Sequence, residues 1–307
     1  MNWAINLLKF FASIGIVLFH YSIDRNIIID HLNVLIGLFF VLSGFLLKYS
    51  DKEVKVLSIG KFYRKRLIRI VPVYWLVLAP YLLFSDGSIK IKIMHSLLMQ
   101  SWMIDSSDVL ALNSPTWFLS VLILFYVLYP FLRNLDIRTL KIIQYVLFGF
   151  VIFSGEGELF YSPIFHLQLF VYGVRLANED SIDNTDIFVT IILLSSFVYS
   201  DNLLVLHNGL FFVLWGILIL GALRIGKRGK NRTLHIVSNF LGKISFAIYL
   251  LQAIVYAGLG LFFNFTDSAG FCVYLALLIL VSIIFHLLFE VPITKGLIRI
   301  LGPRQRR

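Results

Sequence analysis

Long apolar runs alternate with short polar segments along the whole chain. Each run has about 13 to 20 residues, the length that an α-helix needs to cross a bilayer with support from its flanks. The pattern therefore predicts an all-α, polytopic membrane protein with about ten transmembrane helices in a single domain, 1–307. The runs lie at 4–21, 33–49, 70–84, 116–132, 142–154, 161–176, 187–201, 205–223, 244–263 and 270–289.

A further apolar stretch, 89–104, differs from these runs because it contains three ionisable side chains. Lys90, Lys92 and His95 are spaced through it, and a charge at hydrocarbon depth is costly. We expect this stretch to form an interfacial or re-entrant segment instead of a span.

The composition supports the membrane class. Of the 307 residues, 59% are hydrophobic and 14% are charged, whereas about a quarter of the residues in soluble domains are charged. The first run has almost no basic segment before it and no small-residue cleavage site after it, so we expect it to be retained as a helix. A single cysteine, Cys272, excludes an intrachain disulfide and a zinc site built on several thiolates.

The lysines and arginines are distributed unequally between alternate loops. With the N-terminus inside, 23 of the 27 fall on the inner side. Only Arg25, Lys90 and Lys92 fall outside, and Lys9 lies within the first run. The positive-inside rule therefore predicts a multi-pass membrane protein with cytoplasmic termini. The net charge of +10 follows from this topology, and no nucleic-acid partner is expected.

The first run carries a polar stripe along one face. Lys9 and His20 are separated by three helical turns, or about 16 Å along the axis, and Ser13 lies between them. Asn6 is expected to extend the stripe. A lysine exposed to hydrocarbon costs about 2.5 kcal/mol or more, so this face must contact protein or water. The stripe predicts a functional face.

A cluster of cations precedes the third run. Arg64, Lys65, Arg66 and Arg69 lie within six residues. The cluster suits a cytoplasmic anchor that stops transfer across the membrane, and it equally suits an anion site, because guanidinium groups bind phosphate through paired hydrogen bonds.

Several polar or aromatic side chains in other runs have both a structural and a functional interpretation. Trp117 begins the fourth run and suits either an interfacial belt or a substrate site. Tyr249 and Gln252 share a helical face with Ser245, and they could line a cavity or bond to neighbouring helices. Glu290 could neutralise a cytoplasmic arginine.

Small residues and the remaining histidines complete the set of candidates. Gly37 and Gly44, with Ser43 beside the latter, are spaced to let helices approach closely. His166 is the main rival to His20 as a reactive histidine. The sequence contains no metal-binding, nucleophile-elbow or phosphate-loop motif, so no metal is expected.

Six of these stretches occur in an order that resembles the acyltransferase type 3 family of integral-membrane enzymes, which acylate mainly cell-surface glycans. The shared stretches are Lys9 with His20, FFVLSGFLL at 39–47, FYRKRLIRIVPVYW at 62–75, WFLSVLILFYVLYP at 117–130, SFAIYLLQ at 245–252 and FEVP at 289–292. The resemblance spans nearly the whole chain. It implies about ten transmembrane helices and a cytosolic acyl-CoA donor, with acetyl-CoA the first choice.

The chain departs from the family pattern at two positions. Leu122 stands where many members have glutamate, and Gln252 stands where many have histidine, which leaves His20 as the family-matched histidine. The resemblance assigns catalysis to His20 and the donor site to Lys9, Arg64, Arg66 and Arg69. It assigns the acceptor site to Trp117, Tyr249 and Gln252, with Ser13, Ser43, Gly44 and Glu290 in support.

The sequence thus predicts an O-acyltransferase that moves an acyl group from cytosolic acyl-CoA to a sugar hydroxyl of a surface polysaccharide or its lipid-linked precursor. The expected partners are this acceptor and membrane lipid. An alternative is a glycan-lipid flippase whose translocation path is lined by the polar stripe and which needs no donor. A membrane scaffold with its polar groups satisfied between helices is a third possibility.

Overall fold

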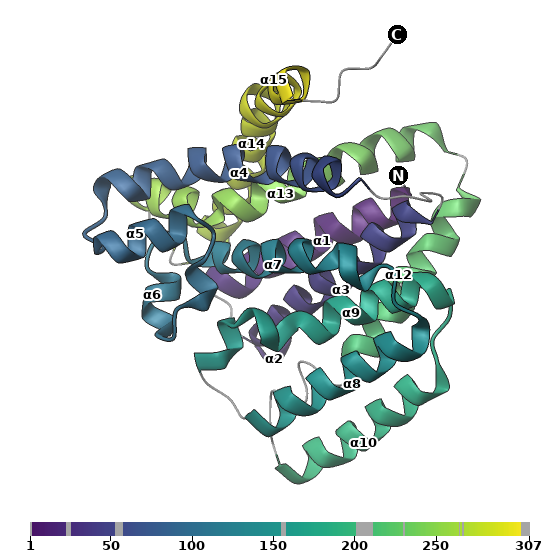
Figure 1. The fold of residues 1–307 in the computed structure, drawn as a ribbon. Helices are drawn as coiled ribbons and strands as arrows, with labels where there is room; N and C mark the ends of the chain where they lie inside the picture. The colour runs from purple at the N-terminus through teal and green to yellow at the C-terminus, as the bar shows by residue number, and fades with distance from the viewer. Residues whose placement is uncertain are drawn as a thin grey trace.

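The computed structural model of the chain is a bundle of helices (Figure 1), and it describes residues 2–22, 26–52, 58–154, 158–200, 211–229, 231–263, 265 and 267–301. No strand occurs among these residues. The helices are α1 (Trp3–Tyr21), α2 (Ile27–Asp30), η1 (Leu32–Val34), α3 (Leu35–Asp51), α4 (Ile59–Phe84), α5 (Ile89–Ser96), η2 (Gln100–Trp102), α6 (Ser106–Leu110), η3 (Ser114–Thr116), α7 (Trp117–Leu132), α8 (Ile137–Ser154), η4 (Glu158–Tyr161), α9 (Pro163–Glu179), α10 (Asn184–Ser200), α12 (Phe211–Arg228), α13 (Arg232–Gly260), α14 (Ser268–Phe285), the π-helical η6 (His286–Glu290) and α15 (Val291–Leu301).

The all-α class and its membrane character are confirmed. Each of the ten predicted runs coincides with a helix as far as it is described. Within the described residues, six helical segments are long and apolar enough to cross a membrane, while the count of ten spans and the cytoplasmic termini stay predictions. The six are Trp3–Tyr21, Ile28–Asp51, Ile59–Phe84, Ser114–Leu132, Arg232–Gly260 and Ser268–Leu301.

The stretch 89–104 folds into two short pieces. Helix α5 has eight residues, which gives a length of about 12 Å, and the turn η2 follows it. Neither piece could span a bilayer. His95 is buried in this segment, and its Nε2 lies 3.0 Å from the carbonyl oxygen of Asp108.

Some of the predicted features fall outside the described residues. They are the first part of the run 205–223, the last residue of the run 187–201, and the basic residues Arg25, Lys55, Lys230, Arg304, Arg306 and Arg307.

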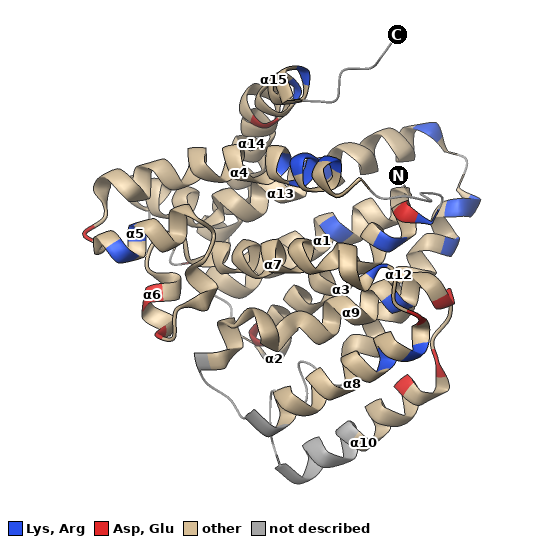
Figure 2. Ribbon diagram, viewed as in Figure 1, with Lys and Arg blue, Asp and Glu red and all other residues tan. Residues whose placement is uncertain are grey.

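The basic residues that are described gather at one end of the bundle (Figure 2), where α1, α4 and α13 begin and α9 and α12 end. Lys90 and Lys92 of α5 lie at the other end.

The closest helix crossing is between α3 and α9. A Cβ atom added at Gly44 would lie 2.2 Å from the carbonyl oxygen of Phe170, and one added at Gly173 would lie 2.0 Å from that of Val41. Two glycines thus let the two backbones touch, as small residues do in membrane bundles. This contact fixes α3 against the core.

Helices α1 and α13 pack side by side through a second close contact. Asn6 is fully buried there, and its Nδ2 donates to Oδ1 of Asn239 over 2.6 Å. A Cβ atom at Gly242 would lie 2.7 Å from Cβ of Asn6. The prediction that Asn6 extends the polar stripe of α1 is therefore wrong, because its side chain faces α13 instead.

The acidic segment between α9 and α10 is neutralised by neighbouring cations. Arg175 and Asp186 form an ion pair in which both side chains are fully buried, and the Tyr145 hydroxyl donates to the same carboxylate over 2.6 Å. Lys141 pairs with Asp183, and this hydrogen bond holds the pKa of the Asp183 carboxyl below its usual range. These contacts explain why acidic residues lie at the basic end of the bundle.

Candidate functional site

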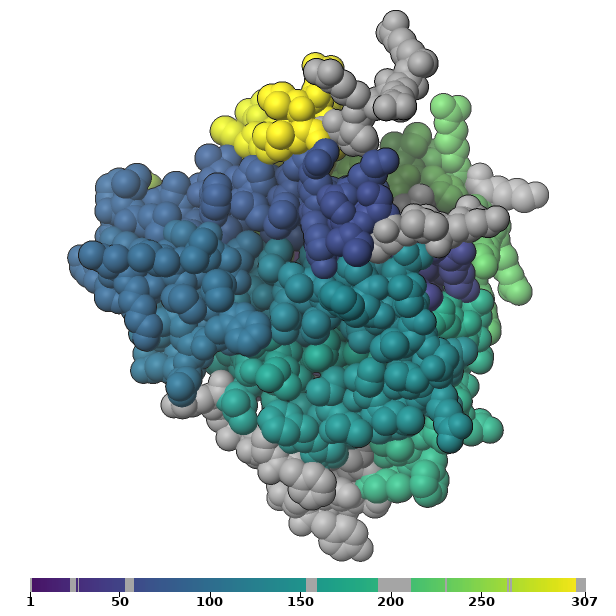
Figure 3. Space-filling model, viewed as in Figure 1, coloured from purple at the N-terminus to yellow at the C-terminus, as the bar shows by residue number. Residues whose placement is uncertain are grey.

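A cavity of about 890 Å³ lies inside the bundle along α1. The N-cap of α1 and five residues of the helix line it, at intervals of three or four: Asn2, Ile5, Lys9, Ser13, Ile16 and His20. Because this stripe runs from the N-cap of α1 to its last turn, the cavity extends about 27 Å along the helix. The other walls come from α3, α4, α7, α12 and α13. The side chains of α4 to α7 form the left and central part of the face of the molecule seen in Figure 3.

The local sequence explains how α1 presents this stripe. The Asn2 side-chain oxygen caps the helix by accepting hydrogen bonds from the backbone N–H groups of Ala4 and Ile5, at 3.0 and 3.3 Å. Its Nδ2 donates to the carbonyl oxygen of Leu223 over 2.9 Å, which ties the start of α1 to α12. This cap fixes the rotation of α1, so Lys9 and His20 face the same cavity.

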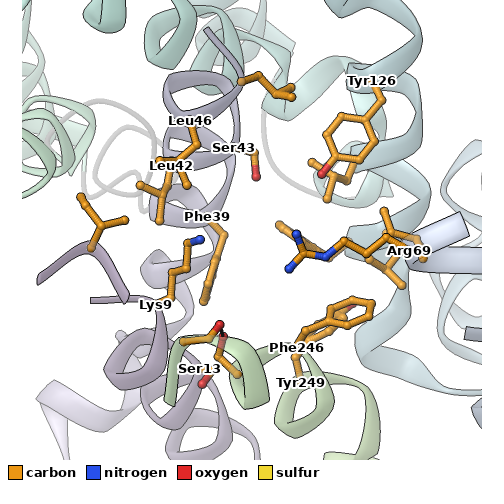
Figure 4. A pocket seen from close by; sticks show the side chains of 18 of the residues that line it. Lys9, Ser13, Phe39, Leu42, Ser43, Leu46, Arg69, Tyr126, Phe246 and Tyr249 are labelled. Atoms are coloured by element: carbon orange, nitrogen blue, oxygen red, sulfur yellow. Dashed lines mark hydrogen bonds between the residues drawn. The ribbon is translucent and has the colours of Figure 1, made fainter. Parts of the chain in front are cut away.

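Three cations converge in the middle of the cavity. Lys9 and Arg69 point toward one another from opposite walls (Figure 4), and both Arg69 and Arg66 repel the Lys9 ammonium electrostatically. Arg66 lies over the rings of Phe62 and Tyr126, at 5.6 and 5.5 Å from their centroids. Its buried Nε has no hydrogen-bond partner within the described part of the chain. The arrangement favours an anion.

The four cations between Arg64 and Arg69 lie on different faces of α4, so not all of them line the cavity. Helix α4 begins at Ile59, so the whole cluster is helical, whereas the sequence suggested that it lay before the span. Lys65, Arg66 and Arg69 line the cavity. Arg64 is exposed, does not line the cavity, and donates from Nη1 to the carbonyl oxygen of Leu301 over 2.6 Å. Arg64 therefore contacts α15, separately from the other two arginines assigned to the donor.

The other end of the cavity is aromatic. His20 lies in the last turn of α1, and its side chain is exposed. Trp117 lines the cavity and is only 4% exposed, so it is not an interfacial belt residue. The Tyr249 ring lines the same wall, while its hydroxyl donates to the carbonyl oxygen of Pro115. Tyr249 thus also orders the turn before Trp117.

Besides Arg64, three predicted site residues lie outside the cavity lining. Gln252 is buried, and its Nε2 donates to the carbonyl oxygen of Tyr249 over 3.1 Å. Glu290 pairs with His286 at 2.7 Å, so the expectation that it neutralises an arginine is wrong. Gly44 lies at the crossing of α3 and α9. The supporting residues Ser13 and Ser43 do line the cavity, and Ser13 bonds to the carbonyl oxygen of Phe10.

The rival histidine is enclosed by aromatic rings. His166 stacks on Phe40 with 4.8 Å between centroids, and its Nε2 lies 2.8 Å from the carbonyl oxygen of Phe160. It is not among the residues lining the 890 Å³ cavity. Its position supports packing around Trp117, whose ring centroid is 5.4 Å away. Among the described residues, no group of three or more His, Cys, Asp or Glu side chains could hold a metal ion.

Comparison with known proteins decides the family. The model of the acyltransferase domain of the type 3 family matches residues 2–287. The chain belongs to this family. The match includes every helix that lines the cavity and ends just before Leu288, so only η6 and α15 extend beyond it. The cavity described above is therefore the candidate site of an acyltransferase.

One characterised relative is the acyltransferase MdmB from Streptomyces mycarofaciens. It is 29% identical over 122 residues, which is 35% of this chain. The matched part is 31% of the length of that relative. No solved structure matches the chain.

The sequence motifs missed several residues of the acyltransferase cavity. Tyr126 of α7 contributes its ring beside Arg66, and Phe39 of α3 covers the wall beside Lys9. Three more charged residues line the cavity from the ends of helices: Lys52, Asp180 and Lys227. Their segments carry no recognisable spacing relative to His20, and only the folded bundle brings them together.

Proposed function

We propose that this protein is a membrane O-acyltransferase that transfers an acyl group, acetyl in the simplest case, from cytosolic acyl-CoA to a sugar hydroxyl of a surface polysaccharide or its lipid-linked precursor. The observation that carries the proposal is the single cavity that joins converging cations to His20. Family membership supports the reaction class. The gathering of basic residues at one end of the bundle supports a cytoplasmic position for that end.

The dimensions of the cavity suit an acyl-CoA donor. Lys9 and His20 are about 16 Å apart along α1, and an extended pantetheine arm is about 15 to 20 Å long. Phosphates held by Lys9, Arg66 and Arg69 would therefore place the thioester near His20. Arginine suits this role because its planar fork binds phosphate oxygens in pairs.

His20 provides the reactive group in two possible routes. As a general base, it takes the proton from the acceptor hydroxyl, the oxygen attacks the thioester carbon, and the carbon–sulfur bond breaks to release the thiol. In the covalent route, the His20 imidazole attacks the thioester carbon and the carbon–sulfur bond breaks to release the CoA thiolate. The acceptor oxygen then attacks the acyl carbon, the acyl–nitrogen bond breaks, and the imidazole takes up the hydroxyl proton. Trp117 and the ring of Tyr249 offer flat apolar surfaces for the acceptor within the same cavity as His20.

The proposal is tested by purifying the protein into lipid vesicles and supplying acetyl-CoA labelled in its acetyl group together with surface-glycan precursors. Label should appear on the acceptor. His20→Ala should reduce the transfer by at least about a hundredfold, the low end for loss of a general base, while the variant inserts and accumulates as the wild type does. Transfer that persists in His20→Ala would exclude both routes.

Two further observations separate the alternatives. Movement of glycan across the vesicle membrane without transfer of label would favour a flippase and contradict the proposal. When the acceptor is omitted, label retained on denatured protein would indicate the covalent route, and its absence in His20→Ala would place the acyl group on that residue.

A further inference from the structure

A second set of charged side chains surrounds the basic end of the cavity, away from His20. Lys52 caps the end of α3, Lys227 lies in the last turn of α12, and Lys65 lies in the second turn of α4. All three line the cavity. They come from three different helices and lie at the basic end of the bundle. We call these three lysines the mouth lysines.

One carboxylate accompanies the mouth lysines. Asp180 is the one acidic residue among the described residues that line the cavity. Its two carboxylate oxygens lie 3.0 and 2.9 Å from Nζ of Lys52. The Lys52 ammonium also lies 5.6 Å from the centre of the Tyr49 ring, which lines the cavity too. Asp180 therefore occupies the position that an anionic ligand of Lys52 would take.

The backbone holds Asp180 at this position. Its φ of 55° is left-handed, a conformation that aspartate and asparagine tolerate better than most residues. Its N–H donates to the carbonyl oxygen of Leu176 over 3.0 Å, which ends α9. The side chains of Lys52 and Asp180 are 35% and 59% exposed. An ion pair with this exposure is worth only about 0 to 1 kcal/mol, so a ligand with a higher charge could replace the carboxylate.

The spacing of the two cation groups matches the donor. Lys9 lies seven residues beyond Asn2, which is about 10 Å along α1, and Asn2 lines the cavity at the same end as the mouth lysines. A diphosphate held by the central cations directs its pantetheine arm toward His20. The nucleoside then extends in the opposite direction, toward the mouth. The phosphate monoester on its ribose reaches the mouth lysines.

We propose that the mouth lysines Lys52, Lys65 and Lys227 form a second anion subsite, which binds the phosphate monoester of the acyl-CoA nucleotide, and that Asp180 holds Lys52 until this phosphate replaces it. The inference rests on the proposed acyl-CoA donor. A phosphate monoester carries about 1.5 to 2 negative charges near neutral pH, against one for a carboxylate. Replacement of the Asp180 carboxylate by the phosphate monoester at Lys52 is therefore favourable.

The test compares two donors in lipid vesicles: acetyl-CoA and acetyl-dephospho-CoA, which lacks only the monoester. The wild type should use acetyl-CoA with a kcat/KM about tenfold higher, the size expected for one charge-assisted contact. Lys52→Ala should lower kcat/KM for acetyl-CoA toward the value for acetyl-dephospho-CoA. Lys52→Ala should lower kcat/KM for acetyl-dephospho-CoA by a much smaller factor, because this donor lacks the monoester, and a wild-type thermal unfolding midpoint shows that the variant is folded.

Asp180→Asn provides an independent variant, because asparagine keeps the left-handed conformation and removes the charge. It should raise kcat/KM for acetyl-CoA about threefold and leave acetyl-dephospho-CoA unchanged. Lys61→Ala is the matched control, since Lys61 is exposed on α4 and does not line the cavity. It should change neither value.

The outcomes separate the subsite from the reaction itself. Transfer from both donors with equal kcat/KM in the wild type would overturn the subsite and leave the acyltransferase intact. An equal decrease for both donors in Lys52→Ala would also overturn the subsite, because the effect would not depend on the phosphate monoester. Failure of the wild type to use either donor would overturn the proposed function together with the subsite.

Discussion

Two arginine sites at the basic end of the bundle differ in what surrounds the guanidinium group. Arg175 is fully buried, pairs with Asp186, and has Glu179 at 3.3 Å from its Nε. Arg69 is exposed to the cavity and faces Lys9, another cation. The residue type is the same and the helices lie in one bundle. The surroundings differ: carboxylates compensate Arg175, whereas Arg69 lines the cavity that we propose as the donor site.

The difference follows from the cost of burying charge. A buried cation is tolerated when carboxylates and hydrogen bonds compensate it, and the resulting contact holds helices together. Cations that face one another across a cavity repel, and an anion entering that cavity removes the repulsion. The Arg175 site is compensated by carboxylates of the protein, whereas we propose that Lys9, Arg66 and Arg69, which line the cavity, bind the donor.

The largest effect is expected on stability, from removal of the buried side chain of Arg175. Arg175→Ala leaves Asp186 buried without its partner, so the free energy of unfolding should fall by about 3 to 5 kcal/mol. The thermal unfolding midpoint of the purified protein in detergent measures this loss. The double variant with Asp186→Ala should lose less than the sum of the single losses. A midpoint equal to that of the wild type would contradict the structural assignment of Arg175.

The next largest effect is expected from removal of Arg69, which lines the cavity. Arg69→Ala should keep the wild-type unfolding midpoint, because no carboxylate depends on this guanidinium within the described residues. It should raise the KM for acetyl-CoA at least about tenfold, since a hydrogen bond between charged groups is lost. A donor titration in lipid vesicles measures the change. If Arg69→Ala unfolds as readily as Arg175→Ala, the contrast between the two sites is wrong.

The apolar pattern was sufficient to predict the helices, because a bilayer imposes one length and one secondary structure on each span. It also predicted that Lys9, Ser13 and His20 share a face, since one helix fixes their relative angles. The pattern did not predict that Asn6 faces α13. The angular difference between Asn6 and the stripe is small, and the fit of Asn6 beside Gly242 decides its direction.

The mouth of the cavity could not be predicted from the sequence. Lys52, Asp180 and Lys227 come from the ends of three helices that are far apart in the chain. Their proximity depends on the crossing of α3 and α9 at Gly44 and Gly173, and on how α12 packs beside them. Sequence spacing carries no information on such contacts. Glu290 is a different case, because its partner His286 lies four residues earlier on the same helical segment, a spacing that the sequence does indicate.

The smallest effect distinguishes neighbouring arginines within one cluster. Arg66→Ala should raise the KM for acetyl-CoA about tenfold, because Arg66 lines the cavity. Arg64→Ala should change it by less than about twofold, because Arg64 is exposed and bonds to Leu301 of α15. Both variants remove one positive charge from the same turn of α4, so they are matched in net charge. Equal effects would mean that the cluster acts as a diffuse positive surface, and that the face of α4 does not select the arginines that bind the donor.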